Sequence, residues 1–273
     1  MKFLKLVFDF YLNASIHVAF SVFVLLRITE IYFELPYNEN LNYFIFFGTI
    51  TGYNFVKYAG VAKLHHRSLT NDLKVIQVFS FFCFLALCFF AYQISLKTLL
   101  VTIPFTLLTV LYAVPFLSGF EKNLRGVSYL KIIVVAFVWA GFTVLIPLVD
   151  LDVEISLNSV LLMLQRFLIV VVLILPFDIR DVKYDAISLQ TIPLKIGIEK
   201  TKKLGLTLLV FSLILEYLFA SELMVKTPFM IFFFLLILFL MRAKVDQSKY
   251  YSSFWVESLP IVWWLLLLGF HNF

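Results

Sequence analysis

The stretch FSFFCFLALCFF, residues 79–90, decides the fold class of this chain, because it is uncharged and apolar around nearly the whole circumference of a helix. A second run, MIFFFLLILFLM at residues 230–241, has the same character. A membrane-spanning strand would alternate apolar and polar residues, and these runs do not alternate. Backbone groups in hydrocarbon must be hydrogen-bonded internally, so such runs predict helices that lie in lipid.

The composition of the whole chain agrees with these two runs. Of 273 residues, 62% are hydrophobic and only 14% are charged, and the mean hydropathy is +0.99. A soluble protein is closer to half apolar and a quarter charged, so this composition excludes a water-soluble fold. We expect an all-α, polytopic membrane protein. The net charge of +5 is explained by basic loops rather than by a nucleic-acid partner.

Apolar segments long enough to cross a bilayer recur along the whole chain. A membrane span needs about 20 mostly apolar residues. No linker or low-complexity stretch interrupts the series, so we expect a single domain over residues 1–273 with about nine transmembrane helices. The predicted spans are residues 11–31, 41–61, 74–93, 98–118, 130–149, 158–178, 203–221, 227–243 and 254–271.

The charges between the spans predict how the chain is oriented. Eighteen of the 22 basic residues fall in the N-terminal segment and in every second connection, whereas the other connections are short and acidic. Cytoplasmic loops of membrane proteins carry an excess of Lys and Arg. We therefore expect a multi-pass protein of the inner membrane with a cytoplasmic N-terminus, surrounded by membrane lipid.

The sharpest polar motif is LPFDIRDVKYD, residues 175–185, at the end of the sixth predicted span. Asp178, Asp181 and Asp185 have i, i+3 and i+7 spacing, which places them within roughly 60° of one another on a helix. Three carboxylates on one face repel each other and are costly beside lipid. Hard oxygen ligands gathered in this way suit Mg²⁺ that bridges to the phosphates of a substrate.

The same helical geometry leaves a second interpretation of these acids open. Arg180 and Lys183 are expected to point to other sides of the helix. In this alternative the three acids form a solvated helix end, partly paired with Lys195 or Lys202 from the following segment.

Two segments together resemble the UbiA-type intramembrane prenyltransferases. The DIRDVKYD run, with its D-x-x-D-x-x-x-D spacing, resembles their second acidic motif, and TIPLKIGIEKTKKLG at residues 191–205 is similar to their downstream T-x-P-x-x-x-G stretch. The resemblance implies nine helices around a central cavity. It also implies that two acidic motifs hold Mg²⁺ and the diphosphate of a prenyl donor, with Asp178, Asp181 and Asp185 as the metal-binding and catalytic acids.

The first acidic motif departs from the family pattern. GYNFVKYAGVA, residues 52–62, keeps Asn54 but has Tyr58 and Ala62 where the family carries aspartates. Asn54 can lend one oxygen at the diphosphate, but neither carboxylate remains. Lys57 could contact the diphosphate as a point charge; the alternative is a lysine that extends from the helix end to water.

The loop after the fourth predicted span also resembles the family. LYAVPFLSGFEKNLRGVSYLK, residues 111–131, resembles its tyrosine and basic loop, which implies that Tyr112, Arg125 and Lys131 contact the diphosphate. Positioned cations stabilise the negative charge that develops on a leaving diphosphate. The alternative is that the two cations only follow the distribution of charge expected of cytoplasmic loops.

The resemblance implies an enzyme, a Mg²⁺-dependent transferase that moves a polyprenyl group from prenyl diphosphate to a lipophilic acceptor within the membrane. The alternative is a catalytically degenerate relative that binds an isoprenoid or another lipid, which the altered first motif favours. A small transporter is a third hypothesis, but the acids gather at one interface rather than at the midplane. No side chain stands out as the proton acceptor, although Arg166, Glu216 and Glu257 are intramembrane candidates for function.

Overall fold

The computed structural model describes residues 2–62, 71–113, 130–183, 191–219 and 223–271. Every regular element in these ranges is a helix, which confirms the predicted all-α class. The α-helices are α1 (Lys2–Asn13), α2 (Ile16–Tyr32), α3 (Glu39–Ala62), α4 (Asn71–Tyr92), α5 (Leu96–Ala113), α6 (Leu130–Ala140), α7 (Ile146–Asp150), α8 (Leu157–Asp181), α9 (Ile192–Ile196), α10 (Ile198–Phe219), α11 (Leu223–Arg242) and α12 (Leu259–His271). Two π-helical turns, η2 (Gly141–Leu145) and η4 (Tyr251–Val256), precede α7 and α12.

Each predicted span coincides largely with a helix or with a continuous run of helices. By length and composition, five described segments can cross a membrane, or six if the bent pair α1–α2 forms one span. The five are 73–92, 130–150, 157–181, 223–242 and 251–270. The protein is therefore a multi-pass membrane protein, whereas the predicted number of nine spans is not confirmed.

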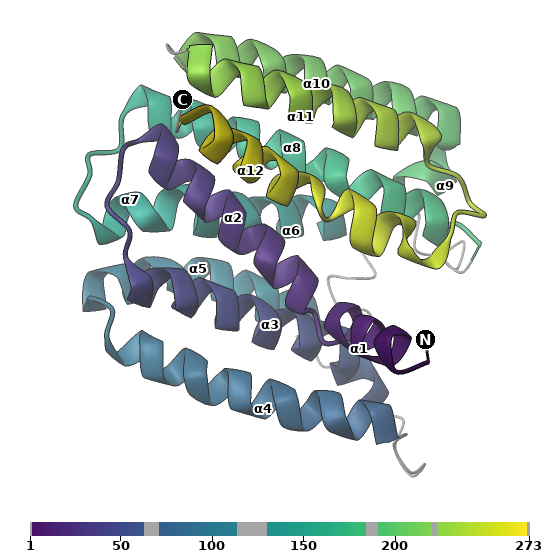
Figure 1. Ribbon diagram of the computed structural model, residues 1–273, viewed down its shortest axis with the longest axis horizontal. Helices are drawn as coiled ribbons and strands as arrows, with labels where there is room; N and C mark the ends of the chain where they lie inside the picture. Colours follow the sequence, from purple (N-terminus) through teal and green to yellow (C-terminus); the bar gives the residue numbers. More distant parts are fainter. Residues whose placement is uncertain (1, 63–70, 114–129, 184–190, 220–222, 272–273) are drawn as a thin grey trace.

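The helices form a closed ring of contacts. α2 packs on α3, α3 on α5, α5 on α6, α6 on α8, α8 on α11, α11 on α12, and α12 returns to α2. α4 lies outside the ring against α3, and α10 lies outside it against α8 (Figure 1). Residues far apart in the chain therefore meet on the inner side of the ring. The central cavity that the family resemblance implies stays a prediction.

The connections between helices lie at the two ends of the bundle, as the predicted topology requires. The connections from α2 to α3, from α4 to α5 and from α7 to α8 lie at one end of the bundle (Figure 1). The short helices α1 and α9 lie at the opposite end, together with the last turns of α3 and α8. We call this second end the α9 end. Its assignment to the cytoplasm stays a prediction.

The first predicted span, residues 11–31, contains a break near its start. The chain bends by 56° between α1 and α2, which together form either one broken span or two separate segments. The bend occurs because Ser15 adopts a left-handed backbone conformation with φ 62°, which interrupts the helical hydrogen bonding. The first long apolar helix therefore begins at Ile16.

A buried polar network joins α2 and α8, which belong to the ring, to α10. Arg166 on α8 has no exposed surface, and its Nη1 donates to the Leu25 carbonyl oxygen at 2.6 Å. Glu216 on α10, also fully buried, accepts hydrogen bonds from Tyr32 at 2.8 Å and from Gln165 at 2.6 Å. Two of the intramembrane charges that the sequence marks as functional candidates therefore hold helices together.

Candidate active site

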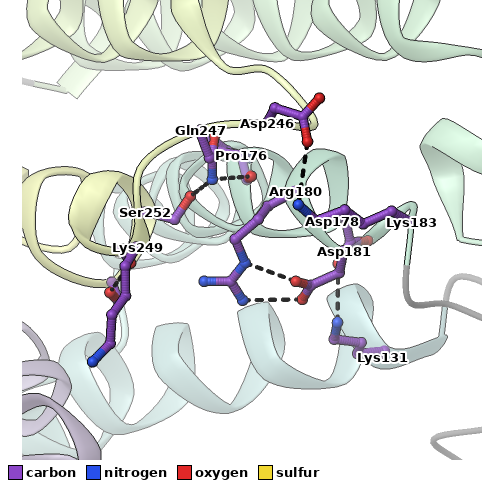
Figure 2. Close-up of polar contacts among 11 residues, drawn as sticks. Lys131, Pro176, Asp178, Arg180, Asp181, Lys183, Asp246, Gln247, Lys249 and Ser252 are labelled. Atoms are coloured by element: carbon purple, nitrogen blue, oxygen red, sulfur yellow. Dashed lines mark hydrogen bonds and ion pairs between the residues drawn. The ribbon is translucent and has the colours of Figure 1, made fainter.

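The last turn of α8 places one carboxylate in the interior at the α9 end. Asp178 is only 1% exposed, so its charge requires a partner. Lys131, in the first turn of α6, supplies one: its Nζ lies 3.0 Å from Asp178 Oδ1 (Figure 2). The α6–α8 contact thus brings together two residues that the sequence predicts to belong to one site.

The second carboxylate is also paired with a cation. The Arg180 guanidinium binds Asp181 with two hydrogen bonds, Nε to Oδ1 at 2.7 Å and Nη2 to Oδ2 at 3.1 Å (Figure 2). The expectation that Arg180 points elsewhere was wrong, because helical spacing fixes only the Cβ direction and the long side chain bends back to its neighbour. Lys183 does turn away from these acids, toward Asp246 at 3.2 Å.

The acids that could hold a divalent cation are only partly placed. Asp185 lies outside the described residues, and so does Arg125. In the described ranges no three His, Cys, Asp or Glu side chains form a group that could hold a metal ion. Mg²⁺ is commonly held by one or two carboxylates together with substrate phosphates, so the chemistry of Asp178 and Asp181 fits that ion.

Tyr112 joins the same region from α5. Its side chain is buried, and it lies close enough to Lys131 to interact with it electrostatically. We name Lys131, Asp178, Arg180 and Asp181 the carboxylate cluster. Tyr112 therefore borders this cluster on the side formed by α5.

Asn54 on α3 braces the break between α1 and α2. Its Oδ1 accepts a hydrogen bond from Ser15 Oγ at 2.7 Å, and its Nδ2 donates to the Ala14 carbonyl oxygen at 3.0 Å and to Ser80 Oγ at 2.8 Å. Asn54 is 3% exposed. Its amide satisfies the Ala14 carbonyl oxygen at the bend and two serine hydroxyls, and its contact with a diphosphate stays a prediction.

Lys57 and Tyr58, on the next turn of α3, also form hydrogen bonds at the break between α1 and α2. Both donate to the Asn13 carbonyl oxygen, the Lys57 Nζ at 3.0 Å and the Tyr58 hydroxyl at 2.9 Å. Lys57 also interacts electrostatically with Arg180 and with Glu257. An ammonium has three donors, so Lys57 can bind a ligand while it keeps this carbonyl contact.

Glu257 is a charged residue that the sequence marks as a functional candidate without a role. It follows η4 at the start of the last apolar segment, and its carboxylate is within electrostatic range of Lys57 and Arg180. The only sequence signal was a charge inside an apolar segment, which marks a functional candidate without indicating the direction of its side chain. Arg180 therefore acts electrostatically on Glu257 while it is paired with Asp181.

Sequence comparisons do not identify a family for this chain. No family model matches the sequence, and no curated protein matches it. The comparison with known proteins therefore rests on the three-dimensional structure.

The structure is similar to solved structures over nearly its whole length. One is a UbiA homolog from Archaeoglobus fulgidus bound to DMAPP and Mg²⁺, with a TM-score of 0.61, 13% identity, and coverage of 96% of this chain and 99% of that one. The GPP- and Mg²⁺-bound form of that homolog also has a TM-score of 0.61, with 13% identity and coverage of 97% and 100%. A digeranylgeranylglyceryl phosphate synthase has a TM-score of 0.57, with 16% identity and coverage of 99% and 98%.

These similarities confirm the UbiA-type fold that the sequence motifs imply. Identities of 13–16% establish a shared fold, and fold alone does not determine function. The chain has the UbiA-type fold of a polytopic, all-α membrane protein.

Proposed function

We propose that this protein transfers a polyprenyl group from prenyl diphosphate to a lipophilic acceptor within the membrane, in a Mg²⁺-dependent reaction. The observation that carries the proposal is the carboxylate cluster, in which two acids and two cations meet at one end of a UbiA-type bundle. The Archaeoglobus fulgidus homolog of the same fold is bound to DMAPP, GPP and Mg²⁺, which supports this substrate class.

The metal would be held at the end of α8. The proposed metal ligands are Asp178 and Asp181, which the structure describes, and Asp185, which is added by its sequence spacing. When bound, Mg²⁺ supplies positive charge that stabilises the leaving diphosphate.

The remaining side chains of the site would bind and orient the diphosphate. Lys131 and Arg180 are paired with carboxylates in this structure, and a diphosphate offers both of them new anionic partners. Arginine suits the bidentate recognition of phosphate, whereas lysine acts as a point charge. The proposed diphosphate-binding residues are Asn54, Lys57, Tyr112, Arg125 and Lys131, to which the structure adds Arg180.

The basic residues of the site also indicate the side of the membrane on which it would lie. The basic α9 end is proposed to face the cytoplasm of the inner membrane, where a water-soluble diphosphate group can enter. The prenyl chain would extend between the apolar helices, and the lipophilic acceptor would reach the site from the bilayer.

Ligand binding measured by thermal unfolding tests the proposal. Purified protein in detergent is heated with MgCl₂, with geranyl S-thiolodiphosphate in EDTA, or with both together. Stabilisation that is much larger with both ligands than the sum of the separate shifts is expected. Asp181→Asn should abolish this gain. Asp246→Asn, the same change at a 90% exposed side chain at the same end, should keep it. No stabilisation of the unmodified protein by the combined ligands would refute the proposal.

The second candidate function is isoprenoid or lipid binding without turnover. The observation that favours it is the loss of both first-motif carboxylates, because Tyr58 is engaged with Asn13 and offers no negative charge. Diphosphate release distinguishes the two functions. Geranyl diphosphate that binds but yields no inorganic diphosphate with extracted membrane lipids as acceptors would favour the binding protein.

A further inference from the structure

A second feature of the α9 end is a groove between the start of α10 and the segment that follows α11, two helices that pack against each other (Figure 1). Its volume is about 670 Å³, within the roughly 300–1,000 Å³ that is usual for small-molecule sites. Its walls are apolar at Ile198, Ala243 and Val245. No residue of the carboxylate cluster lines it, so the groove is distinct from the candidate active site.

The groove lies at the level where a membrane span ends. α11 is long and apolar enough to cross a membrane, and this segment ends at Arg242. Ala243 and Lys244, which line the groove, follow it directly. Residues next to the end of a span lie in the polar headgroup region of the bilayer. A lipid headgroup can therefore reach the groove from the membrane.

The groove carries a positive charge. Lys200, Lys202 and Lys244 line it, and Glu199 is the one acid among its lining residues. Glu199 is 78% exposed, so its carboxylate can turn toward water. The first turn of α10 also lines the groove. Because backbone N–H groups and the positive end of the helix dipole lie at the start of a helix, this arrangement favours an anion.

Lys202 gives the groove a cation that is held by packing. This residue is only 8% exposed, whereas Lys200 and Lys244 are exposed. Its Nζ lies 3.5 Å from Glu199 Oε1, and its ammonium forms no hydrogen bond in the described part of the chain. A charge-assisted hydrogen bond to a phosphate oxygen is stronger than one between neutral groups. Lys202 is therefore placed to bind an anion in the groove, with the two exposed lysines at its rim.

The helices beside the groove offer a surface for acyl chains. Leu206, Val210 and Ile214 are exposed on α10. They follow Lys202 at intervals of four residues, so they continue along the same side of the helix. α11 exposes Phe234 and Leu238. A cationic groove at the end of two lipid-facing helices matches a ligand with an anionic head and apolar tails.

We propose that this groove binds the phosphate group of an anionic phospholipid, with Lys202 as the buried contact and Lys200 and Lys244 at the rim. Basic pockets between membrane helices on the cytoplasmic side bind anionic lipid headgroups in this way, and the α9 end is the proposed cytoplasmic side. The bound lipid links the start of α10 to the end of α11. It is a ligand and not a substrate, so the inference does not depend on the proposed reaction.

Native mass spectrometry of the purified protein in detergent tests the lipid class. The measured quantity is the apparent dissociation constant of the first phosphatidylglycerol that binds. Phosphatidylcholine, which has no net charge, is the lipid control, and inorganic phosphate in excess is the competitor. Phosphatidylglycerol should bind more tightly than phosphatidylcholine and should stay bound in the presence of phosphate. Equal binding of the two lipids, or displacement of phosphatidylglycerol by inorganic phosphate, would overturn the proposal.

Substitution of the lysines tests the location. One basic residue near an anionic membrane surface changes affinity about fivefold, so the double variant Lys200→Gln, Lys244→Gln should bind phosphatidylglycerol about 25-fold more weakly. Both positions are exposed, and the double variant should fold normally. Lys202→Gln should weaken binding by about tenfold or more, because it removes a charge-assisted hydrogen bond. Lys202→Arg, which keeps the charge, should retain most of the affinity.

Lys203→Gln is the matched control, because Lys203 is the next residue on α10, is exposed and does not line the groove. It removes the same charge from the same end of the bundle. Exposed charges at a distance are screened by salt, so its dissociation constant should change by no more than about twofold. An unmodified affinity in the double variant, or equal losses in Lys203→Gln and Lys202→Gln, would overturn the assignment of the lipid to this groove.

Discussion

Replacement of Lys131 by methionine isolates the electrostatic basis of the candidate site. In this structure Lys131 is the cation paired with Asp178, at 3.0 Å, and Asp178 is 1% exposed. Removing one partner of a buried ion pair costs about 3–5 kcal/mol, whereas an exposed pair contributes about 0–1 kcal/mol. Because the Lys131 side chain is 33% exposed, solvent screening reduces the expected loss to about 2–4 kcal/mol.

The loss is measured as the change in free energy of unfolding of the purified protein, by denaturant titration in mixed micelles that contain EDTA. Lys183→Met is the matched control, because it removes a lysine from the same end whose partner Asp246 is 90% exposed. That variant should change stability by no more than about 1 kcal/mol. The two lysines differ in burial and not in chemistry, so the comparison isolates the effect of burial.

Adding MgCl₂ links the same variant to function. Without Lys131, the Asp178 carboxylate has lost its cation, and a divalent ion can take that place. A ligand at 100 times its dissociation constant stabilises the folded state by about 2.7 kcal/mol, so Mg²⁺ should restore much of the lost stability of Lys131→Met and little in Lys183→Met. Equal losses in the two variants, or a Lys131→Met loss below about 0.5 kcal/mol, would refute the reasoning.

Three further substitutions, one of which is also combined in a double substitution, test the fold around the site. Arg166→Met should lower the free energy of unfolding by about 3–5 kcal/mol, since it removes a buried charge that acts on Glu216; in the same denaturant titration, adding Glu216→Gln should make the total loss smaller than the sum of the single losses. Asn54→Leu should lower the free energy of unfolding by about 2–4 kcal/mol, because it leaves buried partners at the α1–α2 break without hydrogen bonds. Asn54→Asp, which keeps an acceptor oxygen at this position, is the comparison in thermal unfolding. Gly141→Ala should lower the free energy of unfolding by about 1–3 kcal/mol, because the added Cβ would overlap the Phe105 ring on α5. Gly269→Ala is the control: a Cβ there meets no atom within 4 Å, so the melting temperature should stay unchanged.

The sequence predicted the helices well because transfer into lipid depends on each residue independently of its partners. The stretch at residues 79–90 is apolar whatever it contacts, and it lies in α4 as expected. The break at Ser15 could not be predicted, because the exposed carbonyl groups of Asn13 and Ala14 are satisfied by α3 side chains about 40 residues away. The energetic compensation for the bend is tertiary, and no local pattern records it.

In the candidate site too, local features could be predicted from the sequence and tertiary contacts could not. Asp178 and Asp181 were identified because helical spacing is a local property. Arg180 was misplaced because its direction depends on the rotamer that reaches Asp181. Glu257 was singled out without a role because the π-helical turn η4 that precedes it leaves no mark in the spacing of apolar residues. Sequence therefore locates charges on helices, and packing decides which of them meet.

The charges gathered at the α9 end favour joint binding of the metal and the diphosphate that the proposed function requires. Among the described side chains, Asp178, Asp181 and Glu257 are offset by Lys131, Arg180 and Lys57. A divalent cation alone must compete with a lysine or an arginine for each carboxylate, and a diphosphate alone meets cations that are already paired. When both arrive, the carboxylates can turn to the metal while the displaced cations turn to the phosphate oxygens, so that neither charge stays uncompensated. Each ligand therefore removes the electrostatic cost of binding the other, which is the thermodynamic condition for positive coupling between two sites.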